Sequence, residues 1–231
     1  MKSGIPKGER VVVAVDGPAG AGKGAVCRAA AWHFGLAYLE TGALYRAVGL
    51  IAARAGLTDP AELARAAAAM PFAYRPLGEG RHGAFLGEEE VSLALRAEAV
   101  GQAASRVAAL PEVRQALLGF QRRYGAGLNL ILDGRDVGSV VWPDADLKIF
   151  LTASLEERAR RRALELQARG EAVNLAELIA SMAERDARDA GRVHAPMEPA
   201  FGAVVVDTTA MSMEESCAAV IARIAPVLGR S

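Results

Sequence analysis

Runs of apolar residues recur along this chain at intervals that predict an alternation of buried strands and helices. Residues 11–15, 128–132 and 147–151 are almost entirely apolar, which is typical of strands covered on both faces. Shorter stretches at 36–39 and 203–206 predict two further strands. We therefore expect an α/β fold of three layers around a parallel sheet of about five strands, with the three longest runs at its centre.

The segments between these runs carry apolar positions at helical spacing. The first predicted helix covers about 22–34 and turns one face to the core, formed by Val26, Ala29, Ala30 and His33. On this pattern His33 is expected to be a partly buried packing residue, because no second metal ligand accompanies it.

Residues 72–92 have a different pattern from the helical segments on either side. Short alternating stretches separated by Gly78, Gly80 and Gly87 predict a small meander of strands. Helical spacing returns over 93–124, and no repeat or low-complexity linker marks a second independent domain. We expect a single domain over residues 1–231 that contains an insertion.

Length and composition are those of a globular protein. The chain has 231 residues, of which 52% are hydrophobic. No apolar run reaches the roughly 18 residues of a membrane span, and the polar start is unlike a signal peptide. With two cysteines, Cys27 and Cys217, a disulfide framework is not indicated. We expect a cytoplasmic protein without a membrane partner.

The charge balance argues against a general nucleic-acid binder, because 27 basic residues match 27 acidic ones. Four of the basic residues are lysines and the other 23 are arginines. Arginine suits bidentate phosphate contacts, but a coding bias would produce the same excess, and composition does not separate the two explanations.

A glycine-rich segment follows the first predicted strand and fits the phosphate-loop pattern G-x-x-x-x-G-K. Glycines let successive backbone N–H groups face one point, toward which the following helix directs its positive end. A plain strand-to-helix turn is the alternative, made improbable by the buried strand before the pattern and the helix after it. The predicted polyphosphate site comprises Gly17, Pro18, Ala19, Gly20, Ala21, Gly22, Lys23, Gly24 and Ala25, with Lys23 as the cation for the β- and γ-phosphates.

The loop departs from the usual pattern at one position. The Ser or Thr hydroxyl that holds Mg²⁺ is missing, because Lys23 is followed by Gly24 and Ala25. Magnesium would then be held by phosphate oxygens, water and a carboxylate elsewhere. Asp133 is the candidate, acting directly or through water, since it ends a parallel strand at the same sheet edge as the loop.

Other polar residues are ambiguous when taken alone. Thr41 can cap a helix whose first-turn N–H groups remain open to an anion, and Arg46 lies about one turn further along. Arg158 and Arg162 are four residues apart and share one helix face. An ordinary capped helix with solvated surface arginines would explain the same residues.

Three segments together resemble one protein family. The phosphate loop, the stretch 39–46 (Leu-Glu-Thr-Gly-Ala-Leu-Tyr-Arg) and the stretch 132–138 (Leu-Asp-Gly-Arg-Asp-Val-Gly) are similar to those of the bacterial cytidylate kinases, P-loop nucleoside monophosphate kinases. The family usually has Asp at the position of Glu40. The run 184–192 also matches the family pattern E-R-D-x-R-D-x-x-R, and the similarity continues nearly to the C-terminus.

The resemblance implies phosphoryl transfer from ATP to CMP or dCMP with Mg²⁺, without a covalent intermediate or a dedicated base. It implies an acceptor-binding insertion over about 42–125, which includes the 72–92 meander, and a lid over about 167–174. We expect a monomer. An AMP or UMP kinase should lack the meander and the pair Ser105 and Arg114, and a nucleotide-binding protein with impaired catalysis is suggested by Ala25. A GTPase is disfavoured because we find no N-K-x-D-type motif.

The resemblance also implies roles for individual residues. Phosphate and catalytic contacts fall to Lys23, Asp133, Arg135, Arg158, Arg162 and Arg188. Cytosine contacts fall to Ser105 and Arg114, sugar contacts to Arg185 and Asp189, and a further base contact to Arg192. The acceptor set is completed by Thr41, Tyr45, Arg46, Arg135 for the acceptor phosphate and Asp136 for the acceptor nucleoside.

Overall fold

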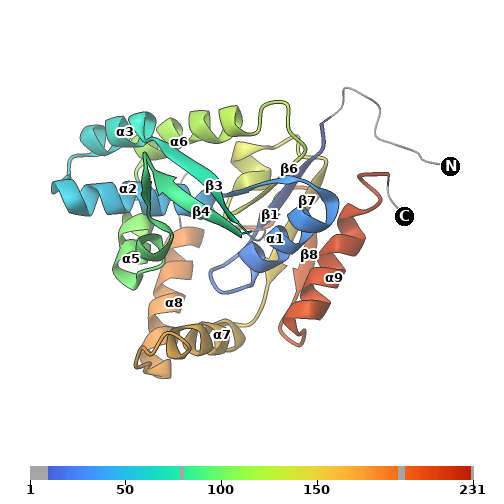
Figure 1. Cartoon of the computed structure of the whole chain (residues 1–231). Helices are drawn as coiled ribbons and strands as arrows, with labels where there is room; N and C mark the ends of the chain where they lie inside the picture. Colours follow the sequence, from blue (N-terminus) through green and yellow to red (C-terminus); the bar gives the residue numbers. More distant parts are fainter. Residues whose placement is uncertain (1–9, 79–80, 192–195, 230–231) are drawn as a thin grey trace. The chain divides into compact units, whose positions relative to one another are not determined.

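A computed structural model describes residues 10–78, 81–191 and 196–229 of the chain (Figure 1). The chain forms two compact units, one made of residues 1–39 and 125–231 and the other of residues 40–124. Each is described by itself below.

The first unit is built around a five-stranded sheet. The predicted central position of the three apolar runs is confirmed by the strand order, which is β2 (Ala37–Glu40), β6 (Leu130–Gly134), β1 (Val12–Asp16), β7 (Leu147–Thr152) and β8 (Val204–Asp207). Strands β6 and β7 both run parallel to β1, and β7 runs parallel to β8. Because Val15 pairs with Asp133, the carboxylates that end β1 and β6 lie at the same edge.

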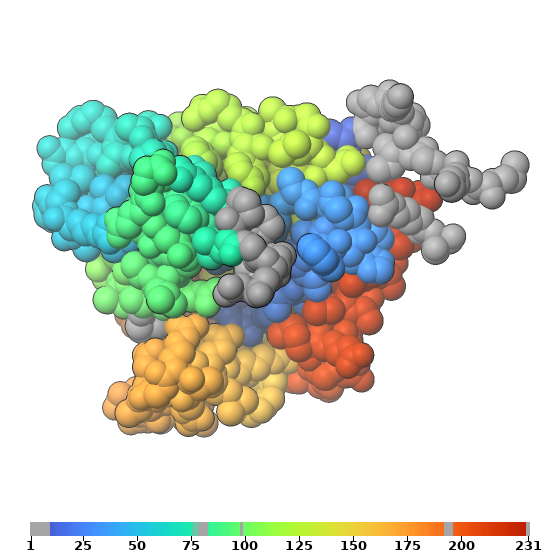
Figure 2. Space-filling model, in the orientation of Figure 1, coloured from blue at the N-terminus to red at the C-terminus, as the bar shows by residue number. Residues whose placement is uncertain are grey.

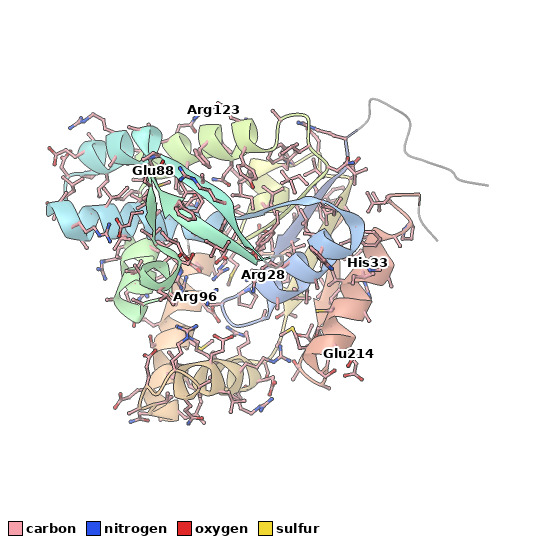
Figure 3. All side chains as sticks on the ribbon, viewed as in Figure 1. Arg28, His33, Glu88, Arg96, Arg123 and Glu214 are labelled. Atoms are coloured by element: carbon pink, nitrogen blue, oxygen red, sulfur yellow. The ribbon has the colours of Figure 1, made fainter. Side chains whose placement is uncertain are left out.

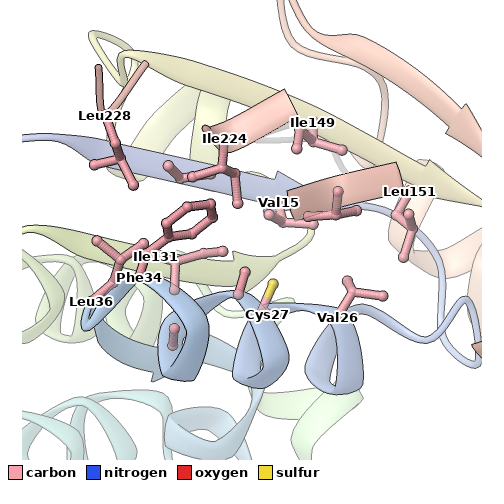
Figure 4. Close-up of a cluster of buried hydrophobic side chains, with 14 of the residues drawn as sticks. Val15, Val26, Cys27, Phe34, Leu36, Ile131, Ile149, Leu151, Ile224 and Leu228 are labelled. Carbon is pink, nitrogen blue, oxygen red and sulfur yellow. The ribbon is translucent and has the colours of Figure 1, made fainter. Parts of the chain in front are cut away.

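Two helices pack on one face of this sheet. α1 (Lys23–Phe34) and α9 (Met213–Ile224) adjoin each other, the blue and red segments of Figure 2, and bury a cluster of aliphatic side chains with Phe34 against the strands (Figure 4). All five residues of β1 are buried, so both faces of the central strand are covered, as its apolar run predicted.

The inward face of α1 differs from the predicted one, because Val26 and Ala30 are buried as expected but Ala29 is only partly buried. Cys27, Ala30, Ala31 and Phe34 are buried at three- and four-residue spacing, while His33 is exposed on the outside of the helix (Figure 3). The expectation that His33 packs in the core was wrong. Phe34 occupies the inward position instead, because it is the larger apolar side chain at the end of the helix.

Two further helices of the first unit follow β7. α7 (Leu155–Gln167) begins at Ser154, whose side chain accepts a hydrogen bond from the Glu157 backbone N–H at 3.2 Å. α8 (Leu175–Ala190) begins at Asn174, whose side chain caps it in the same way. A short π-helical segment, Val137–Val141, follows β6.

The second unit combines helices with a small antiparallel sheet. Its elements are α2 (Thr41–Ala55), α3 (Pro60–Ala69), β3 (Phe72–Gly78), β4 (Arg81–Leu86), β5 (Glu89–Glu90), α4 (Ser92–Leu95), α5 (Glu98–Val107) and α6 (Pro111–Tyr124). The predicted meander is confirmed as the three-stranded sheet β3–β4–β5, and α2 packs on α5 while α3 packs on α6. Across the described residues of both units, every helix falls short of the length and apolar character needed to cross a membrane.

Candidate functional site

The glycine-rich loop between β1 and α1 needs glycine for two different reasons. Gly17 has φ 144°, and a Cβ there would stand 2.0 Å from the backbone carbonyl oxygen of Leu151 on β7. Gly20 and Gly22 adopt left-handed conformations with φ of 78° and 89°. The loop therefore folds tightly against a central strand in a conformation that side chains would block.

The loop ends at the N-terminus of α1, where an anion is favoured. Gly22 is the N-cap residue, and no side chain caps the helix there. Its first-turn N–H groups and the positive end of its dipole therefore remain suited to a phosphate. This fits the polyphosphate site predicted for residues 17–25.

Lys23 is buried at the start of this helix. Its ammonium donates a hydrogen bond to the Pro18 carbonyl at 2.7 Å, which holds it across the loop. Burial is the largest cause that lowers the pKa of Lys23, to about 7, and the nearby Arg135 lowers it further. Asp133 and Asp16 oppose this shift. An incoming polyphosphate would favour the charged ammonium, as a phosphate-binding lysine requires.

Asp133 lies beside the loop at the end of β6. One of its carboxylate oxygens, Oδ2, accepts a hydrogen bond from the Tyr38 hydroxyl at 3.1 Å and would be 3.5 Å from a Cβ at Gly24. A carboxylate at this edge has the oxygen chemistry that Mg²⁺ prefers, and a single protein carboxylate suits an ion that keeps its waters and binds phosphate oxygens. The residues present therefore fit a magnesium ion, although Ala25 offers no hydroxyl.

The segment after β6 carries the next two predicted site residues. The Nε of Arg135 donates to Oδ2 of Asp189 on α8 at 3.0 Å, and Asp189 is only 2% exposed. Asp136, the next residue in the chain, is also buried. The structure thus brings together Arg135 and Asp189, to which the resemblance gave an acceptor phosphate and its sugar.

Asp16 was not predicted as a site residue. Its two carboxylate oxygens accept hydrogen bonds from the backbone N–H groups of Val137 at 2.7 Å and Gly138 at 2.8 Å. Burial is the main cause that raises the pKa of Asp16 to about 6, against these two donors. The available signal was its position, since Asp16 ends β1 just as Asp133 ends β6.

The predicted phosphate-binding arginines of α7 and α8 lie in different surroundings. Arg158 is buried and contacts the loop backbone and an acidic residue of α8. Arg162 pairs with Glu165 at 3.0 Å, and the exposed Arg188 pairs with Glu184 at 3.0 Å. Their contacts with phosphate remain predictions.

Two predicted site residues of the run 184–192 remain, Arg185 and Arg192. Arg185 is partly buried on that helix. Arg192 lies outside the described residues.

In the second unit, the start of α2 differs from the expectation. Glu40 is the N-cap residue and Thr41 is the first residue of the helix, so the prediction that Thr41 caps it was wrong. Thr41 is buried one turn before the partly exposed Tyr45. The helix begins one residue early because strand β2 runs directly into it.

Arg46 on α2 and Ser105 on α5 belong to two helices that pack against each other. The guanidinium of Arg46 donates to the Leu95 carbonyl at 2.7 Å and lies against Gly101, where a Cβ would be 3.1 Å from it. Gly101 and Ser105 are one turn apart on α5 and so share a face. Arg114 is partly buried on α6 of the same unit.

The hydroxyl group of Ser105 is buried without a hydrogen-bond partner among the described residues. Burying a hydroxyl without a partner costs about 1–3 kcal/mol, so such groups in native proteins call for an explanation. A polar ligand group would supply the missing partner.

The chain was compared with known proteins. The family model for cytidylate kinase matches residues 13–226. A cytidylate kinase of Magnetococcus marinus is 53% identical over 220 residues, covering 95% of this chain and 98% of that protein. One from Geobacter sp. strain M21 is 47% identical over 207 residues, covering 89% and 88% respectively. Among solved structures, a shikimate kinase of Bacteroides thetaiotaomicron aligns with a TM-score of 0.44 and 14% identity over 95% of this chain and 98% of that one.

Proposed function

Because this chain belongs to the cytidylate kinase family, we propose that it transfers the γ-phosphoryl group of ATP to CMP or dCMP, giving ADP with CDP or dCDP. The observation that carries the proposal is the extent of the match, which spans nearly the whole chain and nearly the whole of a relative. The phosphate-loop geometry supports it independently, since the loop suits a nucleoside triphosphate.

The donor phosphates would be held by the loop of residues 17–25. The backbone N–H groups and the end of α1 bind the phosphate oxygens, and Lys23 places its ammonium against the β- and γ-phosphates. Phosphoryl transfer depends mainly on aligning the two nucleotides and on offsetting the negative charge of the transferring phosphoryl group. No protein nucleophile and no dedicated base are therefore required.

We propose Mg²⁺ as the accompanying ion, with Asp133 as the residue that holds it, directly or through water. When bound, the ion offsets charge on the phosphate oxygens. Asp133 is oriented for this by the Tyr38 hydroxyl, and the absence of a hydroxyl at Ala25 leaves more of the coordination to water and phosphate.

The acceptor contacts are proposed from the resemblance, residue by residue. Ser105, whose buried Oγ lacks a partner among the described residues, would hydrogen-bond the cytosine together with Arg114. The resemblance gives the acceptor phosphate to Arg135 and the sugar to Arg185 and Asp189. We further propose that the chain acts as a cytoplasmic monomer whose lid spans about 167–174.

A coupled assay of ADP release with CMP, dCMP, UMP and AMP as acceptors tests the function. CMP and dCMP should support turnover with a higher kcat/KM than UMP and AMP. A preference for AMP or UMP would contradict the acceptor assignment. Binding of ATP and CMP without turnover would instead favour a nucleotide-binding protein with impaired catalysis, the alternative that Ala25 suggests.

The variant Ser105→Ala tests the acceptor site. Removing a hydrogen bond to the base should raise KM for CMP by roughly tenfold while leaving KM for ATP unchanged. Ser92→Ala in the same unit is the matched control, because its Oγ accepts the Ala84 N–H at 2.9 Å and its loss should lower stability without changing KM for CMP.

A further inference from the structure

Arg158 connects three parts of the first unit through one buried guanidinium. Its Nε donates to the Ala153 carbonyl at 2.9 Å, next to the start of α7, and its Nη1 donates to the Ala19 carbonyl in the phosphate loop at 3.1 Å. The same Nη1 lies 2.6 Å from Oδ2 of Asp186 on α8. With its side chain only 7% exposed, Arg158 is fixed by these contacts.

The contact with Ala19 determines which way a loop N–H points. The peptide bond between Ala19 and Gly20 is trans, so the Ala19 carbonyl and the Gly20 N–H point in opposite directions. Because Arg158 holds the carbonyl on the α7 side, the Gly20 N–H is directed to the other side of that peptide. When an N–H group already points at the binding site, the anion binds without a free-energy cost for reorienting the loop.

α8 supports this arrangement with a single face. Met182, Asp186 and Asp189 follow one another at four- and three-residue spacing and therefore lie on the same side of the helix. Met182 would meet a Cβ at Gly20 at 3.0 Å, Asp186 pairs with Arg158, and Asp189 pairs with Arg135. One helix face thus contacts both the phosphate loop and the segment after β6.

The charge of Asp186 is the feature that keeps Arg158 on the loop carbonyl. A buried guanidinium without a carboxylate partner would carry a large desolvation penalty. The second oxygen of Asp186, Oδ1, is buried and has no hydrogen-bond partner among the described residues, so Oδ2 and its pair with Arg158 provide the compensation for burying this group.

We propose that Asp186 is a positioning residue for the donor site: it holds Arg158 on the Ala19 carbonyl and so fixes the Gly20 N–H for a phosphate of ATP. The inference rests on the proposed function, because it concerns ATP binding at the phosphate loop. It differs from a role in which Arg158 itself contacts a phosphate, since here the guanidinium acts through the loop backbone.

The variant Asp186→Asn separates these roles because they predict opposite signs. If Arg158 acts through Ala19, loss of the carboxylate should loosen the loop, weaken ATP binding by roughly tenfold and raise KM for ATP without changing KM for CMP. If Arg158 bound phosphate directly, loss of its competing carboxylate would release the guanidinium and tighten ATP binding. The affinity is measured by calorimetric titration with ATP, and the two KM values by the coupled assay.

Arg160→Gln is the matched control on the same helix. Arg160 is 60% exposed and pairs with Glu157, so its loss should leave ATP affinity unchanged. Arg158→Lys provides a second test, because one ammonium does not reproduce the guanidinium fork, and it should weaken ATP binding in the same sense. If circular dichroism shows that Asp186→Asn does not fold, unchanged ATP affinity in Arg158→Lys would overturn the positioning role.

The outcomes separate the inference from the function. Unchanged or tighter ATP binding in Asp186→Asn, or an equal rise in both KM values, overturns the positioning role. Failure of the unaltered protein to bind ATP would refute the proposed function itself. A selective loss of ATP affinity with the control unaffected supports the inference.

Discussion

Replacing Gly17 by alanine should damage the protein more than the same change at any open glycine. The added Cβ would lie 2.0 Å from the carbonyl oxygen of Leu151, well inside the ordinary contact distance. Leu151 is a buried residue of β7, which pairs with β1 on one side and β8 on the other. Its backbone is therefore not free to yield, and the loop has to move.

The magnitude follows from two costs at the same position. A φ of 144° is a conformation that residues with side chains rarely adopt, which costs about 1–3 kcal/mol, and overpacking adds a further penalty of about 1–3 kcal/mol. Gly35→Ala is the matched control, because Gly35 also has positive φ, 69°, but nothing lies within 4 Å of its Cβ position. That control should cost about 1–2 kcal/mol.

Urea unfolding and ATP titration measure the difference. Gly17→Ala should lower the free energy of unfolding by about 4 kcal/mol, a large part of the total for a domain, and should weaken ATP binding at least tenfold in the protein that remains folded. Gly35→Ala should bind ATP normally. The reasoning would be refuted by equal destabilisation in the two variants together with normal ATP affinity in Gly17→Ala.

Two further predictions concern residues beside the loop. Ala25→Thr should raise kcat at low Mg²⁺ if the missing hydroxyl limits catalysis, and an unchanged rate in the coupled assay would dismiss that idea. Burial raises the pKa of Asp16 from 3.8 to about 6, so the folded state holds this proton more tightly than the unfolded chain. The stability of the protein relative to Asp16→Asn should therefore fall by about 2 kcal/mol as the pH rises from 4 to 7, measured by urea unfolding, whereas a constant difference would contradict the pKa.

The sequence predicted the centre of the sheet well because strands β1 and β6 are buried on both faces. Residues 11–15 and 130–132 are apolar without interruption, which is typical of strands covered on both faces, and the structure places both at the centre of the sheet. The strands of the 72–92 meander could be predicted equally well, because glycines separate its stretches of alternating apolar and polar residues. In each case the signal is local in sequence.

The role of Asp16 and the surroundings of Arg158 depend on contacts distant in sequence. Asp16 accepts hydrogen bonds from the N–H groups of Val137 and Gly138, which lie about half the length of the chain further along the sequence. No pattern near Asp16 predicts these partners. Arg158 is part of an arginine-rich helix that resembles a solvated surface, yet it is buried because Asp186 and Ala19 lie opposite it. A sequence gives the charge of a side chain but not its partners.

The buried charges at this edge of the sheet also bear on how a polyphosphate enters. Among the described residues that are buried in the first unit, four carboxylates accompany two cations: Asp16, Asp133, Asp136 and Asp189 with Lys23 and Arg158. A triphosphate brought alone to this edge would meet these four carboxylates in a medium of low dielectric constant. Main-chain amides, the less deeply buried arginines and a divalent cation carried with the phosphates would each offset part of the repulsion. The buried carboxylates therefore support the proposed magnesium even though the loop lacks its hydroxyl ligand.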